Sequence, residues 1–291
     1  MPDMSAGIIG TGYYLPEKVL TNFDLEQMVQ TSDAWIVERT GIHERRIADD
    51  GEPVSALAFR AAEMALADAG IAGEDLDLII MATLTSDRII PATSCILQDR
   101  LGAKHAAAFD LSAACSGFVY ASSIAAQFIE SGIYRYVLVI GAETLSKVID
   151  WKDRNTCILF GDGAGAAVFG AVEQGYGIRA FDLGSDGSGG DALEIPSSGS
   201  LHPVTPETIE QRLNYVHMDG KAVFRFATKV MGRTVETSLQ KAGMKREELD
   251  FLVPHQANIR IIQSAAKRLD LPMEKVIINI HRYGNMSAAS I

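Results

Sequence analysis

Cysteine is scarce in this sequence, and its few cysteines lie far apart along the chain. Cys95, Cys115 and Cys157 are odd in number and form no Cys-x-x-Cys pair, which argues against a disulfide framework and a common metal-binding motif. No apolar run approaches the roughly 20 residues that cross a bilayer. The N-terminus also lacks the cationic and apolar segments of a secretory signal. We therefore expect no metal, no membrane partner and a cytoplasmic location.

Positive charge is also in deficit. The chain has 26 Lys and Arg against 37 Asp and Glu, a net charge of −11. Wholesale nucleic-acid binding needs a basic field, so we expect no nucleic-acid partner. The 291 residues are 47% hydrophobic, which is ample for a large core.

Apolar runs alternate with helical patterns along the first 172 residues. Helices are predicted at 55–70 and 116–132. Buried strands are predicted at 6–12, 77–83, 106–112, 136–143 and 163–172. The alternation predicts an α/β fold with layered helices and strands. Since the helix at 116–132 is apolar nearly all round, we expect it to be buried between two sheets.

Two segments of the chain are similar at a constant offset of 173 residues. Ala65–Thr83 and Ser238–Gln256 each read as a helix, a Gly stop, a capped turn and a strand. Helix–Gly–strand units look alike in many α/β proteins, but the identities stay in register and favour an internal duplication. The identical pairs are Leu66/Leu239, Ala69/Ala242, Gly70/Gly243, Glu74/Glu247, Leu76/Leu249 and Asp77/Asp250.

Cys115 stands where an apolar strand turns into a helix. The positive end of a helix favours a thiolate, so this position predicts a lowered pKa and a nucleophilic role. A small buried hydrophobic residue is the alternative, and it is our interpretation of Cys95 and Cys157. His255 follows 140 residues later, within the roughly 130–150 residues typical of papain-like proteases, so a cysteine hydrolase also fits the spacing.

Four motifs stand out: FDLSAACSGF (109–118), FGDGAGAAV (160–168), LVPHQANIRII (252–262) and YGNMSAAS (283–290). TSDAWIVERTGIHERR (31–46) precedes them. Together they resemble the signatures of the β-ketoacyl-acyl carrier protein synthase III family, within the thiolase-like superfamily. The resemblance implies an α/β fold of two duplicated halves in an αβαβα layered sandwich. Residues 1–172 would form the half with the nucleophile, and residues 173–291 the half with the histidine and asparagine.

The resemblance implies a catalytic Cys115, His255 and Asn285. An acyl group from acyl-CoA would be taken by Cys115. Malonyl-acyl carrier protein would then lose carbon dioxide and attack the acyl-cysteine, in the initiating condensation of fatty-acid synthesis. His255 Nε2 and Asn285 Nδ2 would donate to the thioester oxygen as negative charge develops there. No cofactor is implied, because acyl-CoA is a substrate.

Substrate contacts follow from the same motifs. In the family, the residues matching Trp35, Arg39 and Arg154 lie near the adenine nucleotide of coenzyme A. A basic group beside the tunnel would meet an acidic carrier protein; it comprises Arg260, Arg225, Lys267 and Arg268. The remaining tunnel positions implied by the resemblance are Asn258, Gly220 and Phe224.

The resemblance also implies a homodimer, in which Ile90 would line the acyl pocket of the partner. An Ile there, in place of a bulky aromatic residue, predicts primers larger than acetyl. Family members continue several dozen residues past Ile291 with a Gly-rich loop that holds the acyl-cysteine oxygen, so we expect this sequence to be part of a longer one. The alternatives are a related condensing enzyme of a polyketide pathway, the papain-like hydrolase and a non-catalytic scaffold.

Overall fold

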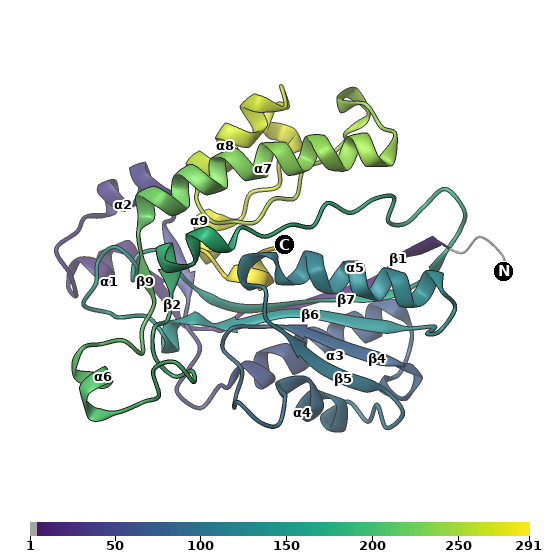
Figure 1. The fold of residues 1–291 in the computed structure, drawn as a ribbon, viewed down its shortest axis with the longest axis horizontal. Coiled ribbons are helices and arrows are strands. Elements are labelled where there is room, and N and C mark those ends of the chain that lie inside the picture. The colour runs from purple at the N-terminus through teal and green to yellow at the C-terminus, as the bar shows by residue number, and fades with distance from the viewer. Residues whose placement is uncertain (1–4) are drawn as a thin grey trace.

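The computed structural model describes residues 5–291, and one mixed sheet forms its centre (Figure 1). The strand order is β1-β7-β6-β4-β5. β6, β4 and β5 run parallel, whereas β1 and β7 pair antiparallel with each other and β7 pairs antiparallel with β6. The strands are β1 (Ser5–Tyr14), β4 (Leu78–Ala82), β5 (Ala107–Leu111), β6 (Val137–Thr144) and β7 (Asp162–Val172), which confirms the five predicted strands.

Helices cover both faces of this sheet. α3 (Val54–Ala69) and α4 (Thr93–Arg100) lie on one face, and α5 (Gly117–Glu130) lies on the other (Figure 1). Successive side chains of a strand point to opposite faces. Accordingly, Ile79 and Met81 of β4 pack in the cluster around α3, while Leu78 and Ile80 pack in the cluster around α5. The central strands are therefore apolar on both sides, as their sequences predict.

Smaller elements follow β1 in the chain and lie beside one end of the sheet (Figure 1). β2 (Val19–Thr21) and β3 (Glu44–Arg46) pair antiparallel. Between them lie α1 (Asn22–Glu26) and α2 (Asp33–Thr40). Ser32 caps α2 by accepting a hydrogen bond from Trp35 N, and Gly41 ends it in the left-handed conformation with φ of 78°.

The second part of the chain is mainly helical. Its longer helices are α7 (Gly220–Ala242) and α8 (Ile259–Arg268), which pack together. The shorter elements are β8 (Leu193–Glu194), α6 (Pro206–Glu210), β9 (His217–Met218), α9 (Ile280–Tyr283) and the 3-10 turns η2 (Ala114–Ser116) and η7 (Ser287–Ser290). No helix among residues 5–291 is both long and apolar enough to span a bilayer.

The predicted repeat is visible in the helix ends. α3 ends at Gly70 with φ of 67°, and α7 ends at Gly243 with φ of 68°. A 3-10 turn follows each glycine at the same distance: Asp75 accepts a hydrogen bond from Ala72 N, and Glu248 accepts one from Lys245 N. The two segments thus share their helix stop and their capped turn.

The strand predicted at the end of the second repeat is wrong. In the first repeat, β4 pairs with neighbouring strands along its whole length. In the second repeat, Leu252 forms only an isolated bridge with Val276 among residues 5–291. The side chain of Gln256 takes up the backbone groups that a ladder would use: Nε2 donates to Ile277 O, and Oε1 accepts from Asn279 N and Ile280 N. The chain then turns into α9 instead of extending, and His255 lies in an irregular segment.

Candidate active site

Cys115 lies in η2, between the end of β5 and the first residue of α5. Ala114 precedes it with φ of 47°, a conformation that L-residues seldom adopt. Burial is the largest influence on the thiol and raises its pKa to about 11. The lowering predicted from the helix N-terminus is therefore wrong for this structure, because the cost of burying a thiolate outweighs the favourable end of the helix.

Asn285 lies two residues before η7 and is held by three hydrogen bonds. Its backbone N–H donates to Leu159 O at 2.9 Å, and its carbonyl accepts from Gly161 N at 3.0 Å. Its side-chain Oδ1 accepts from Ser287 N at 2.9 Å. The amide Nδ2 donates no hydrogen bond within the part of the chain that the structure describes, so it is available to a ligand.

His255 reaches the same turn from the other side. Its Nδ1 lies 2.6 Å from Ser290 Oγ. Its Nε2 is buried without a hydrogen-bond partner among residues 5–291. Burial lowers the pKa of the imidazole to about 4, so the ring is neutral at pH 7.

The turn η7 connects these residues to Cys115, because it packs against η2 and β6. At Gly141 of β6 a Cβ would lie 2.3 Å from Ala288 O, so only glycine permits this approach. Ser287 Oγ is close enough to the Cys115 thiol and the Glu143 carboxyl to favour their ionised forms. It forms no hydrogen bond of good geometry with any described residue.

Glu143 of β6 is a fully buried carboxyl beside this turn. Leu84 N and the hydroxyl of Thr85 donate to it, the latter at 2.7 Å. Burial raises its pKa to about 7, and its negative charge raises the pKa of Cys115. The site therefore holds three titratable groups: a thiol, an imidazole and a carboxyl.

The predicted nucleotide-binding residues also come together. The guanidinium carbons of Arg39 and Arg154 lie 5.3 and 5.1 Å from the centre of the Trp35 ring. Trp35 and Arg39 belong to α2, one turn apart. Asn258 caps α8 by accepting from Arg260 N and donates from Nδ2 to Arg39 O at 3.0 Å. This contact links α8, the helix beside His255, to Trp35, Arg39 and Arg154, which we call the Trp35 group.

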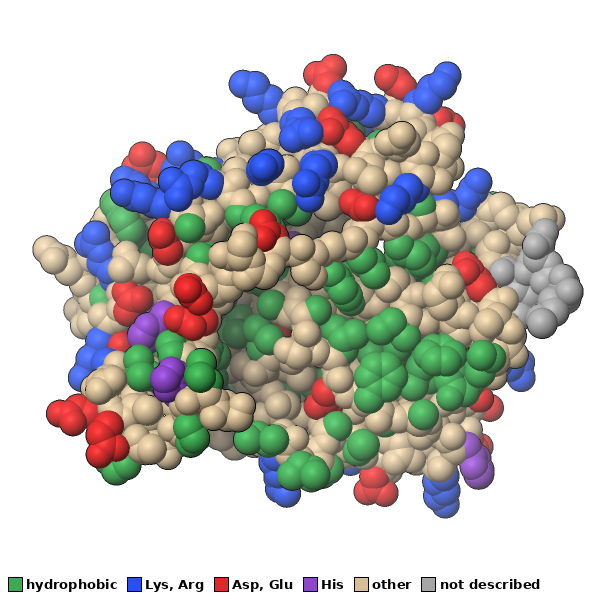
Figure 2. Space-filling view, in the orientation of Figure 1, with side chains coloured by type: hydrophobic (Ala, Val, Ile, Leu, Met, Phe, Trp, Pro, Cys, Tyr) green, Lys and Arg blue, Asp and Glu red, His purple; other side chains and the backbone are tan. Residues whose placement is uncertain are grey.

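Basic side chains gather over α7 and α8 (Figure 2). Arg260 lies over the Phe224 ring, with 5.6 Å between the guanidinium carbon and the ring centre. Arg268 pairs with Glu236 at 2.8 Å, so its charge is partly balanced. The other predicted residues of this surface, Arg225 and Lys267, are exposed, and so is Gly220, which was predicted to line the tunnel.

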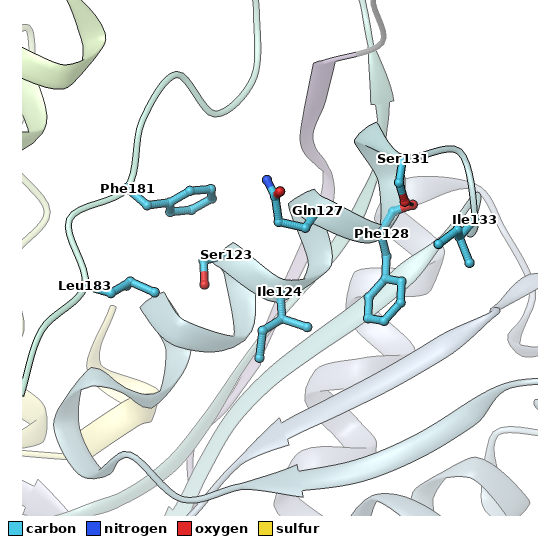
Figure 3. Close-up of a pocket in the computed structure, with 8 residues that line it drawn as sticks. All are labelled: Ser123, Ile124, Gln127, Phe128, Ser131, Ile133, Phe181 and Leu183. Atoms are coloured by element: carbon cyan, nitrogen blue, oxygen red, sulfur yellow. Dashed lines mark hydrogen bonds between the residues drawn. The ribbon is translucent and has the colours of Figure 1, made fainter. Parts of the chain in front are cut away.

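Ile90 lies apart from these residues, 82% exposed, on the segment between β4 and α4. An apolar groove of about 570 Å³ runs along α5, between its Ile124 and Phe128 and the side chains of Phe181 and Leu183 (Figure 3). The sequence predicts that α5 is buried between two sheets. Within residues 5–291 it packs against one sheet face only, so this prediction is confirmed for one side of the helix. The groove does not include Cys115, His255 or Asn285.

Comparison with known proteins identifies the family of this chain. Residues 109–187 match the family model of 3-oxoacyl-[acyl-carrier-protein] synthase III, and residues 239–291 match its C-terminal model. The chain is 59% and 57% identical over 288 residues to β-ketoacyl-[acyl-carrier-protein] synthase III of Caldanaerobacter subterraneus subsp. tengcongensis and Desulfitobacterium hafniense (strain Y51), covering 99% of this chain and 87% of each relative. The chain belongs to the β-ketoacyl-acyl carrier protein synthase III family.

A solved member of the family has the same fold. The crystal structure of the enzyme from Aquifex aeolicus VF5 aligns with a TM-score of 0.90 and 49% identity, covering 98% of this chain and 88% of that one. The predicted α/β, thiolase-like fold class is thereby confirmed. The chain is an acyltransferase of the kind that initiates fatty-acid synthesis by condensation, and the papain-like hydrolase and the scaffold are excluded.

Sequence reasoning missed three polar residues of this synthase: Glu143, Ser287 and Ser290. Each lies within a stretch that was interpreted as strand or as part of a motif, GAE and SAAS. A signal for Glu143 was present, because it ends an otherwise apolar strand, where a lone carboxylate needs partners or a function. The two serines carried no such signal, since Ser is common in turns.

Proposed function

We propose that Cys115 is the nucleophile of this synthase and that His255 and Asn285 act beside it. Cys115 would take the acyl group of acyl-CoA, and the enolate formed from malonyl-acyl carrier protein would attack that acyl group. The observation that carries this assignment is the single turn η7, which holds Asn285, bonds His255 through Ser290 and packs against the turn of Cys115. The amide Nδ2 of Asn285 is the donor that the developing negative charge needs.

Intact mass spectrometry tests the first half-reaction. We expect the purified chain to gain the mass of one acyl group after incubation with acetyl-CoA or a larger acyl-CoA. Cys115→Ala should gain none, whereas Cys95→Ala should gain as much as the parent protein. Cys95 is the matched control because it is an exposed free cysteine, so the buried position predicted for it from the sequence is wrong. An adduct that persists in Cys115→Ala would overturn the assignment.

Trp35, Arg39 and Arg154 are proposed to bind the adenine nucleotide of acyl-CoA, and Asn258, Gly220 and Phe224 to line the path from there to Cys115. The guanidinium groups of Arg39 and Arg154 both lie over the indole ring of Trp35. A planar adenine base can stack on the same flat groups. The hydrogen bond from Asn258 to Arg39 O supports a continuous path, because it joins the Trp35 group to α8.

Arg260, Arg225, Lys267 and Arg268 are proposed to attract the acyl carrier protein. They are exposed positive charges on a chain of net charge −11, beside the proposed entrance. Charge complementarity of this kind acts mainly on the rate of encounter and weakens with salt. KM for malonyl-acyl carrier protein should therefore rise with ionic strength in the parent protein and rise less steeply in Arg260→Ala.

A homodimer through the free edge of β5 is proposed. β5 ends the sheet and packs against α4. Ile89 and Ile90, on the segment that leads into α4, are 92% and 82% exposed. An open strand edge flanked by apolar side chains favours pairing with a second strand. Light scattering after size-exclusion chromatography should give a mass twice that of one chain. Ile89→Asp should lower the measured mass to that of a single chain.

Ile90 would then reach the acyl pocket of the partner subunit and set the size of the primer. Ile90→Phe should reduce acylation by branched acyl-CoA more than acylation by acetyl-CoA. Equal effects on primers of different size would contradict this role. A condensing enzyme of a polyketide pathway, the alternative, would use the same residues and the same first step. The preferred primer and the preferred carrier protein would distinguish it from an enzyme of fatty-acid synthesis.

The division into halves at 1–172 and 173–291 and a cytoplasmic location complete the proposal. The boundary falls directly after β7, and the matched helix ends at Gly70 and Gly243 support duplication. Three free cysteines suit a reducing compartment.

A further inference from the structure

One hydroxyl decides which nitrogen of His255 carries a proton. Ser290 is buried, with 3% of its surface exposed. Its Oγ lies 2.6 Å from His255 Nδ1, 2.8 Å from Ser287 O and 3.3 Å from Gln256 N. Three partners thus share one oxygen.

The three contacts can be satisfied in one way. A serine hydroxyl has one proton to donate and two lone pairs to accept with. Ser287 O can only accept, so the hydroxyl proton goes there, and Gln256 N–H donates to the first lone pair. The second lone pair then accepts from His255 Nδ1–H. The opposite arrangement, in which the hydroxyl donates to Nδ1, would face Ser287 O with a lone pair and lose a buried hydrogen bond, at about 1–3 kcal/mol.

We propose that Ser290 is a positioning residue that holds His255 as its Nδ1–H tautomer, so that Nε2 presents a lone pair to the active site. Nε2 is buried and has no hydrogen-bond partner in residues 5–291, as a group reserved for the reaction would be. The ring is neutral at pH 7 because burial lowers its pKa to about 4, so Nδ1 carries its one proton.

This inference rests on the proposed function and gives the proton of Cys115 a destination. As the Cys115 sulfur bonds to the acyl carbon, its proton passes to His255 Nε2. The bond from that carbon to the coenzyme A sulfur breaks, and coenzyme A leaves as a thiolate that is protonated by water. The imidazolium then has an Nε2–H, the donor that the enolate requires in the second half-reaction. The negative charge of the enolate favours the charged ring, against the burial that keeps the resting ring neutral.

The proton returns when the cycle closes. The enolate carbon bonds to the acyl carbon, and Cys115 leaves as a thiolate that recovers its proton from Nε2. Carbon dioxide carries away the carboxyl group of the malonyl unit, and one proton from water is consumed per turnover. The same nitrogen thus accepts a proton in the first half-reaction and donates a hydrogen bond in the second.

The tautomer can be read directly by NMR on the whole chain. With ¹⁵N-labelled histidine, long-range proton–nitrogen correlations near pH 7.5 distinguish a protonated ring nitrogen from an unprotonated one. The signals of His255 are those absent from His255→Gln. We expect a protonated Nδ1 and an unprotonated Nε2. A resting protein with its proton on Nε2 would overturn the inference.

Two serine variants separate a positioning role from a general effect of losing a hydroxyl. Ser290→Ala should lose the single Nδ1–H pattern and slow acylation of Cys115 by about 10–100-fold, part of the gain that proton transfer supplies. Ser122→Ala removes another buried hydroxyl, which donates to Phe118 O, and should leave both unchanged. An unaltered pattern in Ser290→Ala would also overturn the inference. If the pattern is as expected but acyl-CoA leaves no adduct, the proposed function fails while the tautomer assignment stands.

Discussion

Ala114 and Ser287 are 173 residues apart, and both hold the left-handed backbone conformation, with φ of 47° and 49°. This is the offset of the sequence repeat, and each residue opens a 3-10 turn, η2 or η7. The two turns pack against each other in the candidate active site. The duplication therefore extends to an unfavourable conformation, which costs an L-residue about 1–2 kcal/mol.

Substitutions of Ala114 should show that this conformation positions Cys115. Ala114→Gly removes the steric cost but gains flexibility in the unfolded chain, so we expect a change in unfolding free energy within about 1 kcal/mol and normal alkylation of Cys115. Ala114→Val adds a branched side chain that tolerates positive φ poorly. We expect it to lower the unfolding free energy by at least about 2 kcal/mol and to slow alkylation. Equal behaviour of the two variants in urea unfolding would contradict this account.

Gly141 should be equally intolerant, for a reason of space. A Cβ at this position would lie 2.3 Å from Ala288 O, and backbone cannot yield as a flexible side chain can. Gly141→Ala should lower the unfolding free energy by about 1–3 kcal/mol and reduce acylation of Cys115, because η7 must move. Gly190→Ala is the control, since no atom lies within 4 Å of the added Cβ. If both substitutions were neutral in thermal unfolding, the close packing of η7 on β6 would be disproved.

The first half of the fold could be predicted from the sequence because its signals are local. Strands such as 77–83 are continuous apolar runs, and helix 55–70 ends at a glycine. The second half depends on long-range competition. Leu252 and its neighbours look like a strand, but the side chain of Gln256 bonds the backbone at Ile277, Asn279 and Ile280 that a partner strand would use. That competition is visible only once segments 21–24 residues apart are placed side by side.

The chemistry of the site divides in the same way. Motifs predict catalytic roles for Cys115, His255 and Asn285, and these roles stay predictions, but the pKa of Cys115 was predicted in the wrong direction. A helix N-terminus can be read from the sequence, whereas the burial that outweighs it cannot. Ser290 was not predicted because its importance comes from sharing one hydroxyl among three partners.

Trp35 should contribute to the affinity for acyl-CoA and not to the chemistry at the thiol. Losing one stacked base costs about 1–3 kcal/mol, so Trp35→Ala should raise KM for acyl-CoA by about tenfold or more. Trp35→Phe keeps an aromatic face and should raise it less. Alkylation of Cys115 by iodoacetamide should be unchanged in both, because Trp35 lies on α2, whereas η2 packs on η7 and α5. A KM that does not change in Trp35→Ala would remove Trp35 from the binding site.

Glu143 should make the reactivity and the stability of the protein depend on pH. Its negative charge raises the pKa of the Cys115 thiol. Glu143→Gln keeps the shape without the charge, so the pH profile for alkylation of Cys115 should shift to lower pH. Gln127→Glu is a control for added charge, because Gln127 is exposed on α5, and should leave the profile in place. A profile that is identical in Glu143→Gln would show that the carboxyl does not act on the thiol.

The same substitution should change stability in a defined pH window. Burial raises the pKa of Glu143 from 4.5 to about 7. The folded state therefore holds a proton that the unfolded state releases, and its stability contribution is complete below pH 4.5 and lost as the pH rises through about 7. Glu143→Gln cannot lose this contribution, so its unfolding free energy relative to the parent protein should increase by a few kcal/mol between pH 4.5 and 8. His255, with a pKa lowered to about 4, acts in the opposite direction in both proteins, because its contribution is present above pH 6.5 and lost as the pH falls towards 4. Urea unfolding at several pH values measures the difference in unfolding free energy between Glu143→Gln and the parent protein, in which the histidine contribution cancels. If this difference did not depend on pH, Glu143 would be ionised in the folded protein.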